Sequence, residues 1–168
     1  MALAITTEQV YKWLESVTDP EVPVLTILDL GIVRDVQITE HEAGQTLVRI
    51  MITPTYSGCP AMDVIAMNIR MALMSYGVKQ VKIEQQLSPA WTTDWMTDAG
   101  REKLRQYGIA PPQRKAAHAL GLFEEDEVPC PRCGSQHTTM VSQFGPTSCK
   151  SLYKCDDCHE PFEHFKCH

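Results

Sequence analysis

The sequence predicts an α+β fold, in which a small α-β-β-α-β domain precedes a cysteine-rich ribbon. Helical and strand-like hydrophobic patterns alternate over the first two thirds of the chain. Six of the seven cysteines lie in the last 39 residues, and a polar stretch that contains prolines comes before them. We therefore expect an N-terminal domain over 1–109, a linker over 110–128 and a zinc ribbon over 129–168.

The first expected element is an amphipathic helix over residues 7–17. Thr6 and Gln9 have the spacing of a capping box at its start. Apolar side chains then recur at helical intervals, at Val10, Trp13, Leu14 and Val17. The two prolines that follow, Pro20 and Pro23, cannot continue a helix, so the element must end before them.

Two β-rich segments, over 32–38 and 46–52, predict a β-hairpin. Both are rich in valine and isoleucine. The residues between them are polar and include a glycine, which is typical of a hairpin loop.

A second helix is expected over roughly 60–76, with an apolar stripe that consists of Met62, Ile65, Ile69 and Leu73. Pro60 suits its first position, which makes Cys59 the N-cap. We interpret four methionines of this segment as helix core rather than as a metal-transfer stripe: Met62, Met67, Met71 and Met74. A third strand near 79–87 and a short helix over 97–107 complete the domain.

The composition restricts the class of protein. Over 168 residues, 15 Lys and Arg face 21 Asp and Glu, a net charge of -6. An acidic chain has no electrostatic attraction for nucleic acid or for an anionic membrane surface. No apolar run reaches the ~20 residues that span a bilayer, and the first residues do not have the pattern of a signal peptide. We expect a cytoplasmic protein that binds neither nucleic acid nor membrane.

Two CxxC pairs predict a metal site in the ribbon. Cys130 and Cys133 form the first pair, Cys155 and Cys158 the second, and 21 residues separate them. Each pair can direct two thiolates at one ion, and together they make a tetrahedral four-sulfur site. Such a closed site is structural, and zinc is the expected ion. Iron is the alternative, because the first pair is similar to a knuckle of rubredoxin.

Cys149 and Cys167 remain outside these pairs. One interpretation is that they are small buried residues of the ribbon. The other is that they join a histidine in a second metal site.

Cys59 is a candidate for thiol chemistry. A thiol at a helix N-terminus faces the positive end of the helix dipole, which favours the thiolate. Thr53 and Tyr56 could donate hydrogen bonds to that thiolate or to bound sulfide, and Asp19 and Glu21 could face the same loop. The alternative is that Cys59 is an ordinary capping residue.

Trp91 and Trp95 lie four residues apart in a polar segment. Together they could form an exposed docking surface for a partner. The alternative is that they cover the sheet or pack against the ribbon, since tryptophan is usually largely buried.

Three motifs of the N-terminal domain resemble those of the SufT-like iron–sulfur cluster assembly proteins. They are Asp19-Pro-Glu21, Asp29-Leu-Gly31 and Thr53 followed by Gly58-Cys59-Pro60. The resemblance covers residues 6–88. It implies that Cys59 handles a cluster and that Asp19 assists it.

The whole chain resembles the PaaD family of bacterial phenylacetyl-CoA epoxidase systems. The resemblance rests on the tryptophan segment over 87–96, on residues 105–109 and on the two CxxC motifs of the ribbon. It implies a place in aerobic phenylacetate degradation. The epoxidase itself is a di-iron oxygenase that receives electrons from a reductase with a flavin and a [2Fe–2S] cluster, and the PaaD family matures one of these components.

We therefore expect a non-catalytic accessory protein whose partners are the oxygenase and reductase components. Its cargo would be transient iron or an Fe–S cluster. Because Fe–S clusters normally take four protein ligands, Cys59 would need thiolates from a homodimer, from the recipient, or from Cys149 and Cys167. Two alternatives stay open: a structural adaptor without metal transfer, and an enzyme that uses Cys59 as a nucleophile.

Overall fold

The computed structural model describes residues 5–40, 46–113 and 128–166. The chain forms two compact units, Met1–Trp91 and Thr92–His168, called here the N-terminal and C-terminal units. The predicted domain boundary at residue 109 therefore differs from the unit boundary, which lies between Trp91 and Thr92. Most of the predicted linker, 114–127, lies outside the described residues.

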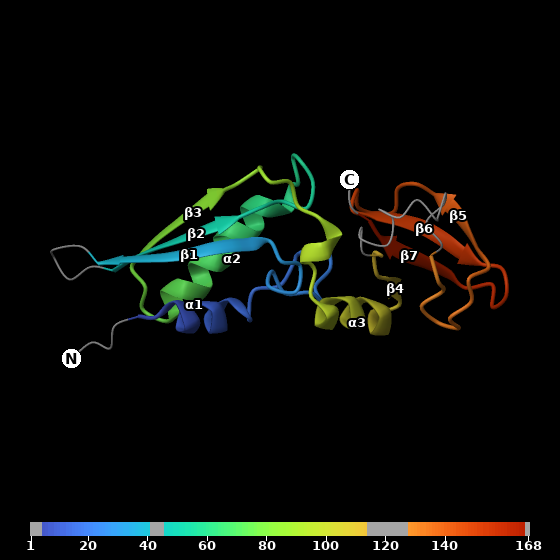
Figure 1. Ribbon diagram of the computed structural model, residues 1–168, viewed down its shortest axis with the longest axis horizontal. Coiled ribbons are helices and arrows are strands. Elements are labelled where there is room, and N and C mark those ends of the chain that lie inside the picture. Colours follow the sequence, from blue (N-terminus) through green and yellow to red (C-terminus); the bar gives the residue numbers. More distant parts are fainter. Residues whose placement is uncertain (1–4, 41–45, 114–127, 167–168) are drawn as a thin grey trace. The chain divides into compact units, whose positions relative to one another are not determined.

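The N-terminal unit has the predicted α-β-β-α-β order. Its elements are α1 (Thr7–Leu14), β1 (Val33–Glu40), β2 (Thr46–Ile52), α2 (Ala61–Ser75) and β3 (Gln80–Gln85). β1 pairs with β2 in an antiparallel hairpin, and β3 joins β2 in parallel. Parallel neighbours need a crossover connection, and α2 supplies it by passing behind the three strands (Figure 1).

The strand register places the apolar side chains on one face of the sheet. Val36 lies opposite Ile50, and Val48 lies opposite Val81. Because side chains alternate between the faces of a strand, this register gathers the core residues on a single side. The other side carries ion pairs from Glu84 to Arg49 and Lys82, at 3.8 and 2.7 Å.

The predicted capping box at the start of α1 is present. The Gln9 amide donates to Thr6 Oγ1 at 3.3 Å, and the Thr6 amide donates to Gln9 Oε1 at 3.0 Å. The helix is shorter than predicted and ends at Leu14. Val17 is nevertheless buried.

One prediction about α2 is wrong. Met62 belongs to the core, but Met67, Met71 and Met74 are 52, 61 and 63% exposed. The helix buries its other side, through Ile65, Ile69 and Leu73 among others. The predicted apolar stripe of Met62, Ile65, Ile69 and Leu73 is the buried side, so the error concerns only the three methionines on the opposite side.

The C-terminal unit combines a helix with the ribbon. It contains a 3-10 turn (Thr93–Trp95), α3 (Asp98–Tyr107), β4 (Ile109–Ala110), β5 (Thr138–Ser142), β6 (Lys150–Cys155) and β7 (Pro161–Phe165). The sheet order is β4-β7-β6-β5. Short strand β4 pairs in parallel with β7, which ties α3 to the ribbon (Figure 1).

One buried cluster of this unit surrounds the predicted metal site. It consists of Ala110, Val128, Cys130, Tyr153, Cys155 and Phe162. Two of these six residues belong to the predicted metal site, so the site is part of the core. Among the described residues, no helix has the length and apolarity needed to cross a membrane.

Candidate functional site

The four CxxC thiols converge on one point. The Sγ atoms of Cys130 and Cys158 are 3.8 Å apart, and those of Cys133 and Cys155 are 3.6 Å apart. All four Sγ atoms lie within 4.8 Å of one another. Ligands of a tetrahedral zinc ion with Zn–S bonds of about 2.3 Å would be about 3.8 Å apart. The thiols therefore fit a structural zinc ion, as predicted.

The two CxxC turns have matching backbone geometry. The Cys130 amide donates to the Ser135 carbonyl at 2.9 Å, and the Cys155 amide donates to the Glu160 carbonyl at 3.0 Å. After each turn one residue has a positive φ: Gly134 at 77° and His159 at 62°. A left-handed conformation is ordinary for glycine and costs a histidine about 1–2 kcal/mol.

Backbone amides and neighbouring thiols set the proton affinity of the cluster. Amides of Cys158 and Asp157 that point at the Cys155 sulfur lower the pKa of Cys155 to about 7. The Ser135 amide lowers the pKa of Cys133, but burial and the other three thiols outweigh it and raise that pKa to about 12. A cation that replaces the shared protons would hold all four as thiolates, since zinc binds deprotonated cysteine.

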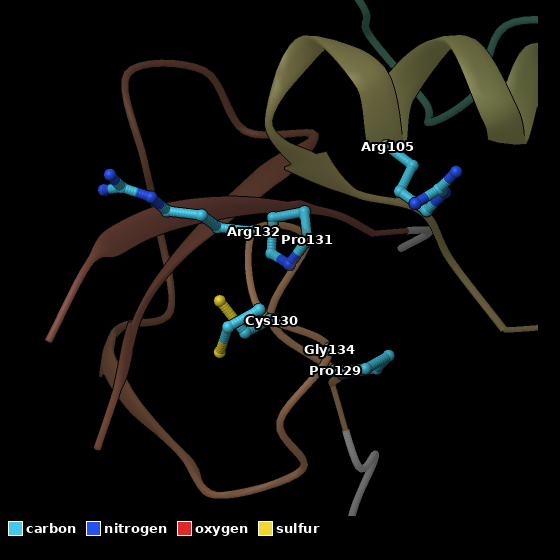
Figure 2. A pocket seen from close by; sticks show the side chains of 7 residues that line it. Arg105, Pro129, Cys130, Pro131, Arg132 and Gly134 are labelled. Carbon is cyan, nitrogen blue, oxygen red and sulfur yellow. The ribbon is translucent and has the colours of Figure 1, made fainter. Parts of the chain in front are cut away.

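A shallow hollow of about 370 Å³ lies beside the first CxxC turn. Figure 2 shows the guanidinium groups of Arg105 and Arg132, which line it, pointing away from the thiols. Both are paired with carboxylates: Arg132 with Glu160, and Arg105 with Glu102 at 2.6 Å. The charges beside the zinc site are therefore compensated.

The predicted second metal site has only one member among the described residues. Cys149 is buried, and its Sγ lies 3.1 Å from Thr147 Oγ1. Cys167 lies outside the described residues. Within the described ranges, the four ribbon cysteines are the single group of three or more His, Cys, Asp or Glu side chains placed to hold a metal ion.

Cys59 lies in the loop between β2 and α2, one residue before the N-cap, which is Pro60. The side chain is partly exposed. The Ala61 amide and the Tyr56 side chain form hydrogen bonds with the sulfur. These contacts match the predicted donation to a thiolate, although Cys59 itself is not the N-cap.

The pKa of Cys59 is raised, contrary to the expectation of a favoured thiolate. Burial is the main cause. The hydrogen bonds from Ala61 and Tyr56 lower the pKa, while the carboxylates of Glu21 and Asp19 add to the rise. The acidic residues therefore lie near enough to act on this thiol, as the sequence suggested, although burial remains the largest cause of the raised pKa.

Asp19 also organises the loop before β1. Its Oδ1 accepts hydrogen bonds from the amides of Glu21 and Val22, at 2.8 and 2.7 Å. Ten residues later, Asp29 Oδ2 accepts from the amide and the hydroxyl of Thr26, both at 2.9 Å. Both aspartates thus form turns, and the turn at Asp19 keeps Glu21 near Cys59.

Thr53 directly follows β2, at the start of the loop that contains Cys59. Its amide donates to the Ile32 carbonyl at 2.8 Å. The side chain is 1% exposed, and its hydroxyl oxygen has no hydrogen-bond partner among the described residues. A buried polar group without a partner is costly, so this hydroxyl is an unsatisfied group next to the Cys59 loop.

The two tryptophans of the predicted docking surface belong to different units. Trp91 is 3% exposed, and its indole N–H donates to the Leu30 carbonyl at 2.8 Å. The structure therefore contradicts an exposed docking role for Trp91, because its indole is buried in the core of the N-terminal unit. Trp95 is partly buried, and its docking role stays a prediction.

Comparison with known proteins assigns both halves of the chain. Residues 7–84 match the family described as iron–sulfur cluster assembly protein, and residues 114–166 match the PaaD zinc beta ribbon domain. Over 159 residues the chain is 51% identical to an Escherichia coli K12 protein whose name provisionally assigns it as a subunit of 1,2-phenylacetyl-CoA epoxidase. That match covers 95% of this chain and 92% of the relative. The chain belongs to the PaaD family.

Relatives outside the PaaD family match a shorter part of the chain. A Porphyromonas gingivalis protein named Fe-S protein maturation auxiliary factor is 36% identical over 100 residues, 59% of this chain and 90% of that protein. Two solved structures share the fold. A domain of unknown function from Bacillus anthracis is 27% identical with a TM-score of 0.52, and covers 58% of this chain and 89% of its own. A conserved hypothetical protein from Thermotoga maritima is 32% identical with a TM-score of 0.51, and covers 62% of this chain and 98% of its own.

These comparisons confirm the predicted family, the α+β fold and the structural zinc site. They also support an accessory role of the iron–sulfur assembly type. Two features of the molecule were not predicted from the sequence. The first is the exposed methionine side of α2, and the second is the burial that raises the pKa of Cys59.

Proposed function

We propose that the protein matures a metal centre of a phenylacetyl-CoA epoxidase system, with Cys59 as the residue that transiently holds iron or an Fe–S unit. The centre would be the Fe–S cluster of the reductase or the di-iron site of the oxygenase. The family relationship supports the pathway, and the match to cluster assembly proteins supports the type of chemistry.

The observation that carries this proposal is the environment of Cys59. A partly exposed thiol has two hydrogen-bond donors, Ala61 N–H and the Tyr56 side chain, directed at its sulfur. Two carboxylates, from Glu21 and Asp19, act on it. A cation is attracted by these carboxylates, and its binding displaces the thiol proton.

A raised pKa suits transient binding. The thiol stays protonated until a metal ion arrives, so metal competes with a proton and is released more easily than from a preformed thiolate. The same raised pKa argues against the third alternative, a nucleophilic enzyme, because the thiolate is the nucleophile. The zinc site is not catalytic, because four protein thiolates leave no open coordination position on the zinc ion.

A co-expression experiment tests the proposal. The oxygenase and reductase components are produced with wild-type protein, with Cys59→Ser, or with Cys149→Ser as a matched control that also removes one non-zinc thiol. Iron and acid-labile sulfide are then counted in each purified component. We expect Cys59→Ser to lower the metal content of one component to the level found without this protein, while Cys149→Ser has no effect.

A structural adaptor is the second candidate, and the C-terminal unit offers an observation in its favour. Met140, Val141 and Phe144 of the ribbon are exposed at 51, 58 and 56%, which suits contact with a partner. If the protein is only an adaptor, Cys59→Ser will support full metal content, whereas Val141→Lys will disrupt assembly of the complex. Normal maturation by Cys59→Ser would therefore replace the first proposal with the second.

A further inference from the structure

Helix α2 is apolar on the side that faces solvent as well as on the side that faces the sheet. Its core side carries Ile65, Ile69 and Leu73. Its exposed side carries Val64, Met67, Met71 and Met74, which we call the α2 stripe. A helix that is apolar all round is normally buried between two layers, and the described part of the N-terminal unit supplies only one of them.

The α2 stripe has the spacing of a helix-pairing seam. Its members are separated by three, four and three residues, which is the spacing of alternating a and d positions of a heptad. Side chains of this size, about half exposed, present on the order of 400 Å² of apolar surface, which is the size of the largest apolar patch on a typical monomer, roughly 300–600 Å², and such patches are often functional. Beside Met71, a hollow of about 320 Å³ widens the surface toward the end of α1.

The flanks of the stripe are compatible with a second copy of the same helix. In a parallel pair, positions g and e of the two helices face each other. Asp63 and Arg70, both exposed and both at g, would then face Asn68 and Ser75 of the second copy. No like charges meet. A standard interface buries about 800 Å² per partner, so the stripe can form the apolar centre of a small one.

The candidate cluster site is incomplete in one copy. Cys59 lies two residues before the first residue of α2. It is the single cysteine that the N-terminal unit contains, whereas an Fe–S cluster normally takes four protein ligands. Two parallel helices whose axes lie about 8–10 Å apart would bring two Cys59 thiols to the same end of the pair.

We infer that α2 is a dimerisation helix: the α2 stripe packs in parallel against that of a second copy, and the two copies together present two Cys59 thiols to one iron–sulfur unit. The thiol-sharing part rests on the proposed function, and the dimer does not. Two ligand positions remain for thiolates of the recipient.

Sedimentation velocity of the full zinc-loaded chain over a concentration series tests the dimer. Wild type should form dimers. The double variant Met67→Lys with Met71→Lys should be monomeric, with dimerisation weakened at least about tenfold. Lysine has nearly the helix propensity of methionine, so α2 should stay folded, which circular dichroism checks. Met140→Lys, a matched change at an exposed methionine of the ribbon, should leave the dimer intact. A monomeric wild type, or a dimer that survives the double variant, would overturn the inference.

Disulfide trapping tests the orientation in a Cys59→Ser background. In a parallel pair, each residue of the stripe faces the same residue of the second copy. Met71→Cys alone should therefore cross-link the two copies under mild oxidation, above the background given by the other cysteines. In an antiparallel pair, cross-links would form only when Met67→Cys and Met71→Cys are mixed, and the shared-thiol arrangement would fail.

The dimer and the proposed function can fail separately. If Cys59→Ser is dimeric yet matures the recipient, the function fails and the dimer stands. If the monomeric double variant still matures the recipient, the function stands and thiol sharing fails.

Discussion

Replacing Trp91 by phenylalanine should destabilise the N-terminal unit by about 2–5 kcal/mol. The indole N–H donates to the buried Leu30 carbonyl at 2.8 Å, and leaving that carbonyl without a partner costs about 1–3 kcal/mol. The smaller ring adds a cavity where the indole was 3% exposed, worth about 1–2 kcal/mol more. For a unit of this size each kcal/mol lowers Tm by about 4–8 °C.

The assay is chemical and thermal unfolding, followed by circular dichroism in the presence of zinc. Trp95→Phe is the matched control, because that side chain is partly exposed and belongs to the C-terminal unit. We expect its effect on the free energy of unfolding to be below about 1 kcal/mol. A loss below about 0.5 kcal/mol for Trp91→Phe, or equal losses for the two variants, would refute the assignment of Trp91 to the core.

Three further predictions concern the two thiol sites. Cys155→Ser, or a strong chelator, should unfold the C-terminal unit and leave the N-terminal unit folded, because structural zinc contributes roughly 10–16 kcal/mol of folding free energy. Amide hydrogen exchange measures the two units separately. Protection retained in the ribbon without zinc would contradict this prediction. His159→Gly should stabilise the zinc-loaded ribbon by up to about 1 kcal/mol in unfolding experiments, since it relieves a left-handed conformation at φ 62°; a destabilised variant would show that the histidine side chain outweighs this strain. Burial, with a smaller contribution from two carboxylates, raises the pKa of Cys59 above its ordinary value. In metal-free protein its alkylation rate should therefore keep rising with pH beyond the pH at which an ordinary thiol levels off, and Glu21→Gln should move that profile to lower pH. The same shift stabilises the fold below pH about 9 and less as the pH rises through the folded pKa, and a midpoint below the ordinary thiol value would disprove it.

Local patterns in the sequence predicted the structure correctly wherever the structure depends on neighbouring residues. The capping box of Thr6 and Gln9 and the two CxxC pairs depend on spacings of three residues, and both have the predicted geometry. The order of helices and strands followed from hydrophobic period. The left-handed φ of 88° at Gly108, placed just past the end of α3, follows from the same local rules.

Features that depend on distant contacts could not be predicted. Trp91 bonds to Leu30, which is 61 residues away in the chain, so its neighbours in the sequence could not decide between exposure and burial. The helix dipole suggested a low pKa for Cys59, whereas burial and Glu21 act in the opposite direction. Strand β4 has two residues, too few to show a period, and it is defined by its pairing with β7.

The α2 methionines show a different limit. The predicted stripe through Ile65 and Ile69 is buried, as expected. Met67, Met71 and Met74 form a second apolar stripe at helical spacing, and the prediction that they also belong to the core is wrong. The exposure of the α2 stripe is therefore known only from the structure.

The most direct test of the central claim is a count of zinc, iron and sulfide per chain in protein purified and reconstituted without oxygen. The account predicts one zinc per chain in every variant that keeps the ribbon cysteines. It further predicts iron and sulfide in the wild type and in Cys149→Ser, and their loss in Cys59→Ser. Iron retained by Cys59→Ser at the wild-type level, or zinc alone in the wild type, would contradict a metal-handling role for Cys59.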